Sequence, residues 1–120
     1  MPFFTAMALV FAQEVSVTST HLTSIERASI IYAERCSICH GEEGAGNGPT
    51  AMAMTPKPTD FSQADYWSNK TDAYVIQQIK YGVPEVFMPA FPKIPEKQLD
   101  SLLLLLKSFQ SNSDVQPVEE

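Results

Sequence analysis

Apolar side chains recur at helical spacing in three segments of the chain, and the first of these follows a helix start signal. Thr23 and Glu26 stand at the spacing of a capping box, in which each side chain accepts a hydrogen bond from the other residue's backbone N–H. The helix predicted after this box runs from Ser24 to Cys36. Four of its side chains share one face, which should point inward: Ile25, Ala28, Tyr32 and Cys36.

A second helix is predicted after Thr71 and Asp72, an N-cap residue followed by an acid in the first turn. Its apolar face consists of Val75, Ile76 and Ile79. Gly82 and Pro84 end the segment, because glycine favours the left-handed conformation at a helix end and proline cannot continue the helix.

The longest amphipathic pattern lies near the C-terminus. Pro95 stands at or near the first position of a helix, where its missing N–H costs nothing, and the pattern continues to about Gln110. The inward stripe consists of Leu99, Leu102, Leu103, Leu106 and Phe109. Leu104 falls roughly opposite this stripe and is a candidate exposed apolar residue.

Between the first two helices the periodicity disappears. Residues 41–62 form an irregular segment rich in glycine and proline, and segments of this length are usually functional or disordered. We expect this one to be functional. Neither strand-like alternation nor an internal repeat stands out, so the sequence predicts an all-α fold with three main helices and long loops.

The composition fits one small domain with an acidic surface. The 120 residues include 14 Asp and Glu against 8 Lys and Arg, for a net charge of −6, which argues against a surface that neutralises phosphates. We therefore expect no nucleic-acid partner. After residue 12, the longest apolar run, residues 102–106, is far shorter than the roughly 20 residues of a membrane-spanning helix, so no transmembrane segment is expected in the mature chain.

The N-terminal residues have the composition of a secretory signal. Residues 1–12 carry no charged side chain and are mostly apolar, although they lack the usual preceding basic residue. We expect a signal peptide or N-terminal hydrophobic segment over residues 1–12, a polar leader over 13–22, the folded domain over 23–110 and an acidic, flexible tail over 111–120. A helix packed on the domain is the alternative for residues 1–12.

Both cysteines belong to one motif, Cys36-Ser37-Ile38-Cys39-His40. A Cys-x-x-Cys-His sequence is the attachment pattern of c-type haem, in which two thiols bind the vinyl groups and the adjacent imidazole binds the iron. Two intervening residues at a helix end place both sulfurs along one edge of the flat macrocycle. The motif therefore predicts a covalently attached haem.

Three alternatives use the same residues. A thioredoxin-like redox pair requires a preceding strand, whereas a helix is predicted here. A zinc site needs four ligands, and only His21 could complete the set of Cys36, Cys39 and His40. A disulfide between the cysteines would leave the histidine without a role. Haem attachment uses every residue of the motif and is favoured.

Beyond this motif the chain resembles the class I monohaem cytochromes c from Ser24 to Gln110, and especially a bacterial branch with a glycine-rich haem loop. The resemblance rests on Cys36-Ser37-Ile38-Cys39-His40-Gly41 followed by Gly44-Ala45-Gly46-Asn47-Gly48-Pro49, on Pro56-Lys57-Pro58-Thr59-Asp60-Phe61, and on Met88-Pro89-Ala90-Phe91 after Gly82. It implies a small cytochrome c-like fold wrapped around one haem c, which is bound through Cys36 and Cys39.

The resemblance also implies that the iron is held by His40 on one side and by the Met88 sulfur on the other. The residues themselves agree, since Pro89 stiffens the loop that presents the thioether. Met52 and Met54 are rival sulfur donors. Related proteins usually carry aliphatic residues at these two positions, so we interpret both as packing in the haem pocket.

The other predicted contacts surround His40 and the haem propionates. A backbone carbonyl should accept the free ring N–H of His40, and Pro49 and Pro56 are both candidates for holding that carbonyl. Trp67 or Tyr66 could donate to a propionate, with plain packing as the alternative. The resemblance further implies a contact between the haem and Phe61.

In these cytochromes the first and last helices cross closely, with a small residue on one helix meeting an aromatic residue on the other. Ala28 and Tyr32 fit the first helix. An aromatic residue is common at the position of Leu105 on the last helix, so we expect this contact to be altered while the fold is kept.

The function implied is that of a single-electron carrier and not of an enzyme, because two axial ligands leave no coordination position for a substrate. Its partners would be redox proteins that donate and accept electrons. The alternative is a tightly bound haem c subunit of a larger respiratory, photosynthetic or periplasmic dehydrogenase complex, docked to a membrane complex in some of these cases. A third hypothesis is sensing or catalysis through loss of Met88. Haem attachment implies export, so we expect a periplasmic or otherwise exported protein.

Overall fold

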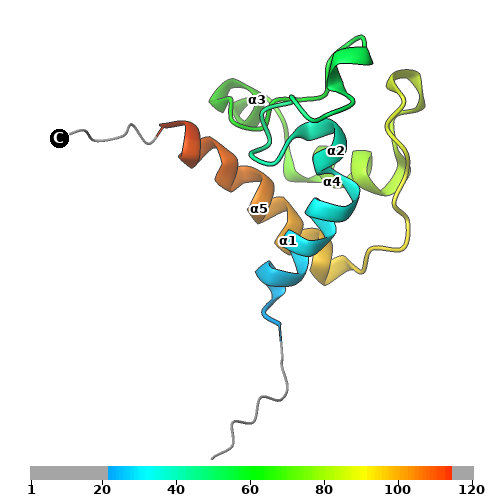
Figure 1. Cartoon of the computed structure of the whole chain (residues 1–120). Coiled ribbons are helices and arrows are strands. Elements are labelled where there is room, and N and C mark those ends of the chain that lie inside the picture. The colour runs from blue at the N-terminus through cyan, green and yellow to red at the C-terminus, as the bar shows by residue number, and fades with distance from the viewer. Residues whose placement is uncertain (1–21, 115–120) are drawn as a thin grey trace, which may run out of the picture.

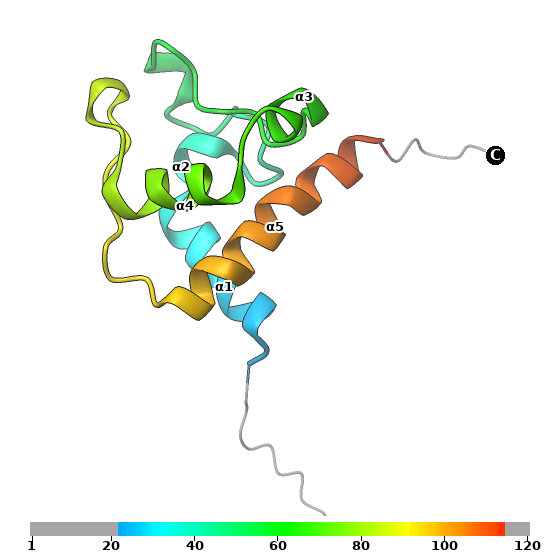
Figure 2. The same ribbon diagram turned by 180° about the vertical axis from the view of Figure 1, so that it is seen from behind.

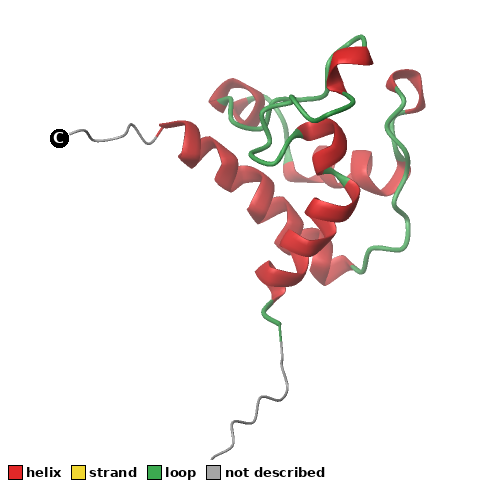
Figure 3. Cartoon of the chain, in the orientation of Figure 1, coloured by secondary structure: helices red, strands yellow, loops and turns green. Residues whose placement is uncertain are grey.

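Helices and long loops make up the described chain. The computed structural model describes residues 22–114, and the side chains of residues 22–110. The helices are α1 (Ser24–Arg35), α2 (Ser37–His40), α3 (Ala64–Ser68), α4 (Asp72–Tyr81) and α5 (Glu96–Asp114), with two short 3-10 helices, η1 (Ala51–Ala53) and η2 (Pro84–Val86). No strand occurs in this part of the chain, where pairing is limited to an isolated bridge between Val83 and Met88 (Figure 3). The predicted all-α fold is confirmed.

Helices α1 and α5 cross, and their crossing forms one side of the core (Figure 1). Ala28 is fully buried there, and the Tyr32 ring lies 5.2 Å from the ring of Phe109 on α5. The predicted capping box of α1 is present: the Thr23 hydroxyl accepts from the Glu26 N–H at 3.1 Å, and the Thr23 N–H donates to the Glu26 carboxylate at 2.9 Å. An aromatic residue thus does meet α1, but it comes from Phe109 rather than from the position of Leu105.

The prediction that Ile25 points inward is wrong. Its side chain is 43% exposed, because the first turn of α1 extends past the crossing with α5 (Figure 2). Periodicity identified the correct face of the helix, but it carries no information about where the partner helix ends.

Helix α4 begins and ends where the sequence predicts. The Thr71 hydroxyl accepts from the Tyr74 N–H at 3.1 Å, and Gly82 follows the helix with a φ of 75°. Val75 and Ile79 are buried in the core, whereas Ile76 is only partly buried.

Two ion pairs join α4 to α5. The Lys107 ammonium lies 2.7 Å from the Asp72 carboxylate, and the Lys80 ammonium lies 3.0 Å from that of Glu96. The hydrogen bond to Glu96 raises the pKa of Lys80. Both pairs are solvated, so each adds little to stability.

Helix α5 supplies the largest share of the core. All five residues of its predicted stripe are buried: Leu99, Leu102, Leu103, Leu106 and Phe109. Leu104 is 64% exposed, as predicted from its place opposite the stripe. The helix starts at Glu96, after the Pro95 carbonyl, which accepts from the Leu99 N–H. It continues to Asp114, so the helical backbone extends into the range predicted as a tail.

Four short elements were not predicted. Helix α2 has four residues, helix α3 has five residues and no side-chain cap at Gln63, and η1 and η2 have three residues each. The predictions for residues 1–21, and for residues 115–120 of the tail, lie outside the described residues. None of the described helices is long and apolar enough to cross a membrane.

The glycine-rich segment packs closely against both crossing helices. The Tyr32 hydroxyl donates to the Gly41 carbonyl at 2.6 Å. A Cβ atom added at Gly44 would lie 2.5 Å from the Phe109 ring, so only glycine lets the backbone approach that ring. The segment after the Cys-x-x-Cys-His motif is thereby fixed on the α1–α5 crossing.

Candidate functional site

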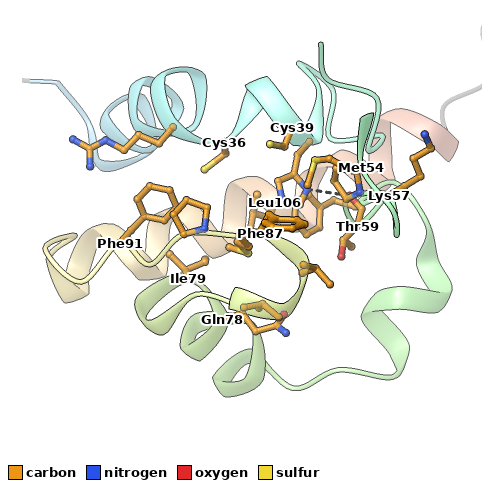
Figure 4. A pocket seen from close by; sticks show the side chains of 18 of the residues that line it. Cys36, Cys39, Met54, Lys57, Thr59, Gln78, Ile79, Phe87, Phe91 and Leu106 are labelled. Carbon is orange, nitrogen blue, oxygen red and sulfur yellow. Dashed lines mark hydrogen bonds between the residues drawn. The ribbon is translucent and has the colours of Figure 1, made fainter. Parts of the chain in front are cut away.

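One pocket collects the chemistry-bearing residues predicted from the sequence. It lies between the α1–α2 junction on one side and α4 with the loop before α5 on the other (Figure 4). Its empty volume, open mouth included, is about 980 Å³. Cys36, Cys39, His40 and Met88 all line it, and Ile79, Leu102 and Leu106 supply apolar surface.

The two cysteines lie along the same side of the pocket (Figure 4). Cys36 is at the C-cap of α1 and Cys39 is within α2, and both are free thiols. Burial raises the pKa of Cys36 to about 11, with Arg35 opposing and Cys39 adding to the shift. The Cys36 thiol is therefore neutral at pH 7, unlike the low-pKa thiolate of a redox-active Cys-x-x-Cys pair.

His40, the last residue of α2, has one ring nitrogen committed to the protein. Its Nδ1 lies 3.1 Å from the Thr59 carbonyl, which fixes the ring orientation and leaves Nε2 as the nitrogen available to a metal. Burial lowers the pKa of His40, and the hydrogen bond to Thr59 offsets part of this effect. The ring is thus neutral at pH 7, the form that binds metals.

The predictions that Pro49 or Pro56 holds the carbonyl for His40 are wrong, since the acceptor is Thr59. Pro56 does line the pocket, whereas Pro49 does not. The acceptor therefore lies further along the chain than Pro49 and Pro56. This part of the chain passes close to Gly46, where an added Cβ would lie 2.6 Å from the Pro58 carbonyl oxygen.

Phe61 lines the pocket as predicted and contacts the His40 ring. The two ring centroids are 4.6 Å apart with an interplanar angle of 24°, which is a stacked arrangement. Phe61 is only 6% exposed. The imidazole is consequently held at one edge by Thr59 and across one face by Phe61.

Met88 is presented by a tightly closed loop. Val83 and Met88 exchange two backbone hydrogen bonds, of 2.9 and 3.2 Å, and the Phe91 N–H donates to the Ile79 carbonyl at 2.8 Å. A Cβ atom at Gly82 would lie 2.8 Å from the Met88 carbonyl oxygen, so the loop can close only over a glycine. These contacts hold the methionine at the pocket wall.

The other two candidate methionines differ in position. Met54 lines the pocket, in agreement with the packing role predicted for it. Met52 is 86% exposed, so the prediction that it packs in the pocket is wrong. The reason is η1, whose turn buries the neighbouring Ala51 and points Met52 to solvent.

The structure does not support contact of Trp67 or Tyr66 with the pocket, since neither residue lines it. The Trp67 indole N–H instead donates to the Phe61 carbonyl at 2.8 Å, so it is not available to a propionate. Tyr66 is half-buried against Phe61 and Trp67, and burial raises its pKa to about 12.

The pocket wall is cationic in a protein that is acidic overall. Arg35 and Lys57 are its charged lining residues, and no carboxylate of the described residues lines it. The Lys57 ammonium donates to the Ala51 carbonyl at 3.1 Å. An apolar ligand that carries carboxylates suits this wall, since its body would contact apolar side chains and its charges would meet cations.

This donor set fits a haem, and the alternatives for the motif fare worse. A helix, not a strand, precedes the cysteines. Across residues 22–114, no three His, Cys, Asp or Glu side chains are grouped to hold a metal ion; His21, needed for the zinc hypothesis, is not among them. The cysteines are not joined in a disulfide.

Sequence reasoning missed Arg35 and Thr59, which both shape the pocket. Thr59 acts through its backbone carbonyl, which leaves no signal in the side-chain sequence. Arg35 does have a signal, because it directly precedes the Cys-x-x-Cys-His motif.

Comparison with known proteins supports this assignment. Residues 23–104 match the family described as Cytochrome C oxidase, cbb3-type, subunit III. The solved Kuenenia stuttgartiensis reducing HAO-like protein complex Kustc0457/Kustc0458 contains a chain that is 32% identical, with a TM-score of 0.61 over 77% of this chain. Our chain spans only 46% of that one.

A second solved structure, the KustC0563 c-type cytochrome, is 25% identical with a TM-score of 0.58. The match covers 69% of this chain and 96% of that one. No curated protein matches the sequence.

Proposed function

Because the chain belongs to the family Cytochrome C oxidase, cbb3-type, subunit III, and is thus a c-type cytochrome, we propose that it carries single electrons on one haem c attached to Cys36 and Cys39. A c-type cytochrome implies covalent haem and a role in electron transfer. The observation that carries the proposal is the convergence of Cys36, Cys39, His40 and Met88 on one largely apolar pocket.

Each of these residues has a defined part in the proposal. The two thiols would hold the haem covalently, and His40, through Nε2, and the Met88 sulfur would be the protein ligands of the iron. When bound, the iron supplies a centre that gains and loses one electron. The apolar wall would limit the access of water to the haem.

The experiment that tests the proposal begins with the exported protein purified with its haem. Its mass should exceed that of the polypeptide by one haem, and this mass should persist after denaturation because the attachment is covalent. Dithionite and ferricyanide should convert the protein reversibly between two spectra. A colourless protein with the mass of the bare polypeptide contradicts the proposal.

The ligand assignment is tested separately, by comparing Met88→Ala with Met54→Ala. Removal of the true sulfur ligand opens a coordination position, so the ferrous Met88→Ala protein should bind carbon monoxide rapidly and lose the weak far-red band of the ferric protein. Met54→Ala is the matched control, since it removes another thioether from the same pocket. The reverse result would assign the ligand to Met54.

The family and one relative favour a second candidate, that of a permanently bound subunit. The family description names a subunit, and the 32% identical chain is part of a complex of HAO-like proteins. In this case the partner is a second redox protein that passes electrons directly to this domain. Size-exclusion chromatography of native material distinguishes the candidates, because a free carrier elutes near its own mass.

Periplasmic location and the domain boundaries are part of the same proposal. Covalent haem attachment takes place after export, so residues 1–12 would act as the export signal and residues 23–110 as the haem domain. N-terminal sequencing of protein from the periplasmic fraction tests both statements. A full-length cytoplasmic protein that contains haem contradicts them.

A further inference from the structure

Trp67 connects to the proposed iron ligand through a short series of contacts. Its indole N–H donates to the Phe61 carbonyl at 2.8 Å, and its ring lies 5.8 Å from that of Phe61. The Phe61 ring is in turn stacked on His40 at 4.6 Å. Trp67 itself lies outside the pocket, so any effect on the ligand must pass through Phe61.

The segment of residues 59–61 contacts the His40 ring at two places. Residues Thr59 and Phe61, two positions apart, contact the imidazole at its Nδ1 edge and on its face. The Phe61 N–H donates to the Gly44 carbonyl at 2.6 Å, while its carbonyl accepts from Trp67. Both backbone hydrogen-bonding groups of Phe61 are therefore anchored, one on each side of the segment.

The residue between them is also restrained. The Asp60 carboxylate accepts from the Ser62 N–H at 2.9 Å and from the Ser62 hydroxyl at 2.6 Å. This local turn sets the direction in which the chain leaves Phe61. The hydrogen bond from Trp67 attaches the backbone of the segment to α3, beside the contact of the Phe61 ring with Tyr66.

We propose that Trp67 is a positioning residue for the axial histidine: its indole N–H holds the Phe61 carbonyl and thereby keeps the Phe61 ring and the Thr59 carbonyl in place against the His40 imidazole. The inference rests on the proposed function, in which His40 binds the haem iron. A hydrogen bond at the second ring nitrogen fixes the plane and raises the basicity of a histidine ligand. Trp67 thus acts on the iron through two intervening contacts.

The test uses the ferrous haem protein with ¹⁵N-labelled histidine, in which the His40 Nδ1–H exchanges with solvent at a measurable rate. In Trp67→Phe, loss of the N–H donor should loosen the Thr59 contact and speed this exchange by about threefold or more, as expected for weakening one hydrogen bond. The ferric g values should change too, because the imidazole plane is less restrained.

Two further proteins separate positioning from packing. Tyr66→Phe is the matched control, because it alters a neighbouring aromatic on α3 without removing the donor to Phe61. Trp67 is the single tryptophan of the chain, so growth on the benzothiophene analogue of tryptophan replaces its N–H by sulfur and keeps the ring shape. The analogue should reproduce the effect of Trp67→Phe, and Tyr66→Phe should leave the exchange rate unchanged.

The outcomes are distinguishable from failure of the proposed function. If the parent protein holds no haem, or shows no ligated His40, the proposed function itself fails. If the parent has both, and the analogue leaves the exchange rate and g values unchanged, the inference is overturned. Loss of haem in Trp67→Phe together with normal exchange in the analogue also overturns it, since Trp67 then serves packing alone.

Discussion

Phe87 combines two features that a protein usually avoids. Its φ of 64° is in the left-handed region, and its side chain is 77% exposed. A side chain with a Cβ pays about 1 kcal/mol or more for this conformation, and an exposed ring gains little from burial. The residue directly precedes Met88 and lines the pocket, so the strain is located at the proposed ligand loop.

The strain predicts an unusual order of stability between two substitutions. Phe87→Gly and Phe87→Ala both remove the ring, but only glycine adopts a positive φ without cost, so Phe87→Gly should be the more stable by about 1 kcal/mol. Urea unfolding of both haem proteins measures the difference. Ser108 is the control, an exposed position within α5, where Ser108→Gly should be less stable than Ser108→Ala. If Phe87→Gly were likewise less stable than Phe87→Ala, the assigned left-handed conformation would be contradicted.

Individual site residues were predictable from the sequence where a motif defined their side chains. They were not predictable where a backbone group makes the contact. Cys36, Cys39, His40 and Met88 were all identified, and all line one pocket. Thr59 was missed because it contributes a carbonyl, and Met52 was misplaced because a single turn of η1 decides which of two nearby methionines points inward.

The attachment of α1 to the motif depends on one buried hydroxyl. Tyr32 is 4% exposed and donates to the Gly41 carbonyl at 2.6 Å, directly after the Cys-x-x-Cys-His sequence. Burial raises the pKa of Tyr32, with Cys36 adding to the shift. The neutral phenol is therefore the form that the fold requires, since only this form donates.

This predicts a loss of stability in alkaline solution. Above pH 10 or so, the ordinary pKa of tyrosine, the unfolded chain releases the Tyr32 proton while the folded protein keeps it, so the free energy of unfolding falls as pH rises. Tyr32→Phe should lower the free energy of unfolding by about 1 kcal/mol at pH 7. Above pH 10 or so, the free energy of unfolding of this variant should fall less steeply than that of the parent. Tyr74→Phe removes the hydroxyl of an exposed tyrosine and is the matched control for loss of a phenol.

Helices with a side-chain cap or a long apolar stripe were predictable, and short ones were not. α1 and α4 begin at threonines whose side chains cap them, and α5 carries five buried residues. Helix α3 has one turn and no side-chain cap, so neither signal exists in its sequence. Its position depends on contacts with the loop before it, among them the hydrogen bond from Trp67 to Phe61.

At the scale of the whole molecule, the proposed haem pocket is continuous with the apolar core. Leu102, Leu106 and Ile79 belong both to the core and to the pocket wall. Without a ligand the pocket is an opening of about 980 Å³ including the mouth, so the apolar atoms that line it lack packing partners on that side. A cofactor that binds only the folded state adds its binding free energy to stability.

The Cys36→Ala, Cys39→Ala double variant, which cannot attach haem, is therefore expected to be largely unfolded. Far-ultraviolet circular dichroism should show little helix, and heating should give no cooperative transition. The haem-containing parent protein is the reference, with a sharp transition. A cooperative transition in the haem-free variant would mean that the polypeptide core is sufficient by itself.

The pocket lining and the rest of this acidic molecule carry charge of opposite sign, and the two affect different properties. The chain has a net charge of −6, yet among the residues whose side chains are described no carboxylate lines the pocket, and its charged lining residues are Arg35 and Lys57. Exterior charge acts on encounter rates at long range, whereas groups beside the redox centre set its affinity for the electron. A charge mutation on the exterior is thus expected to change the rate at which redox proteins encounter this cytochrome and to leave its reduction potential almost unchanged.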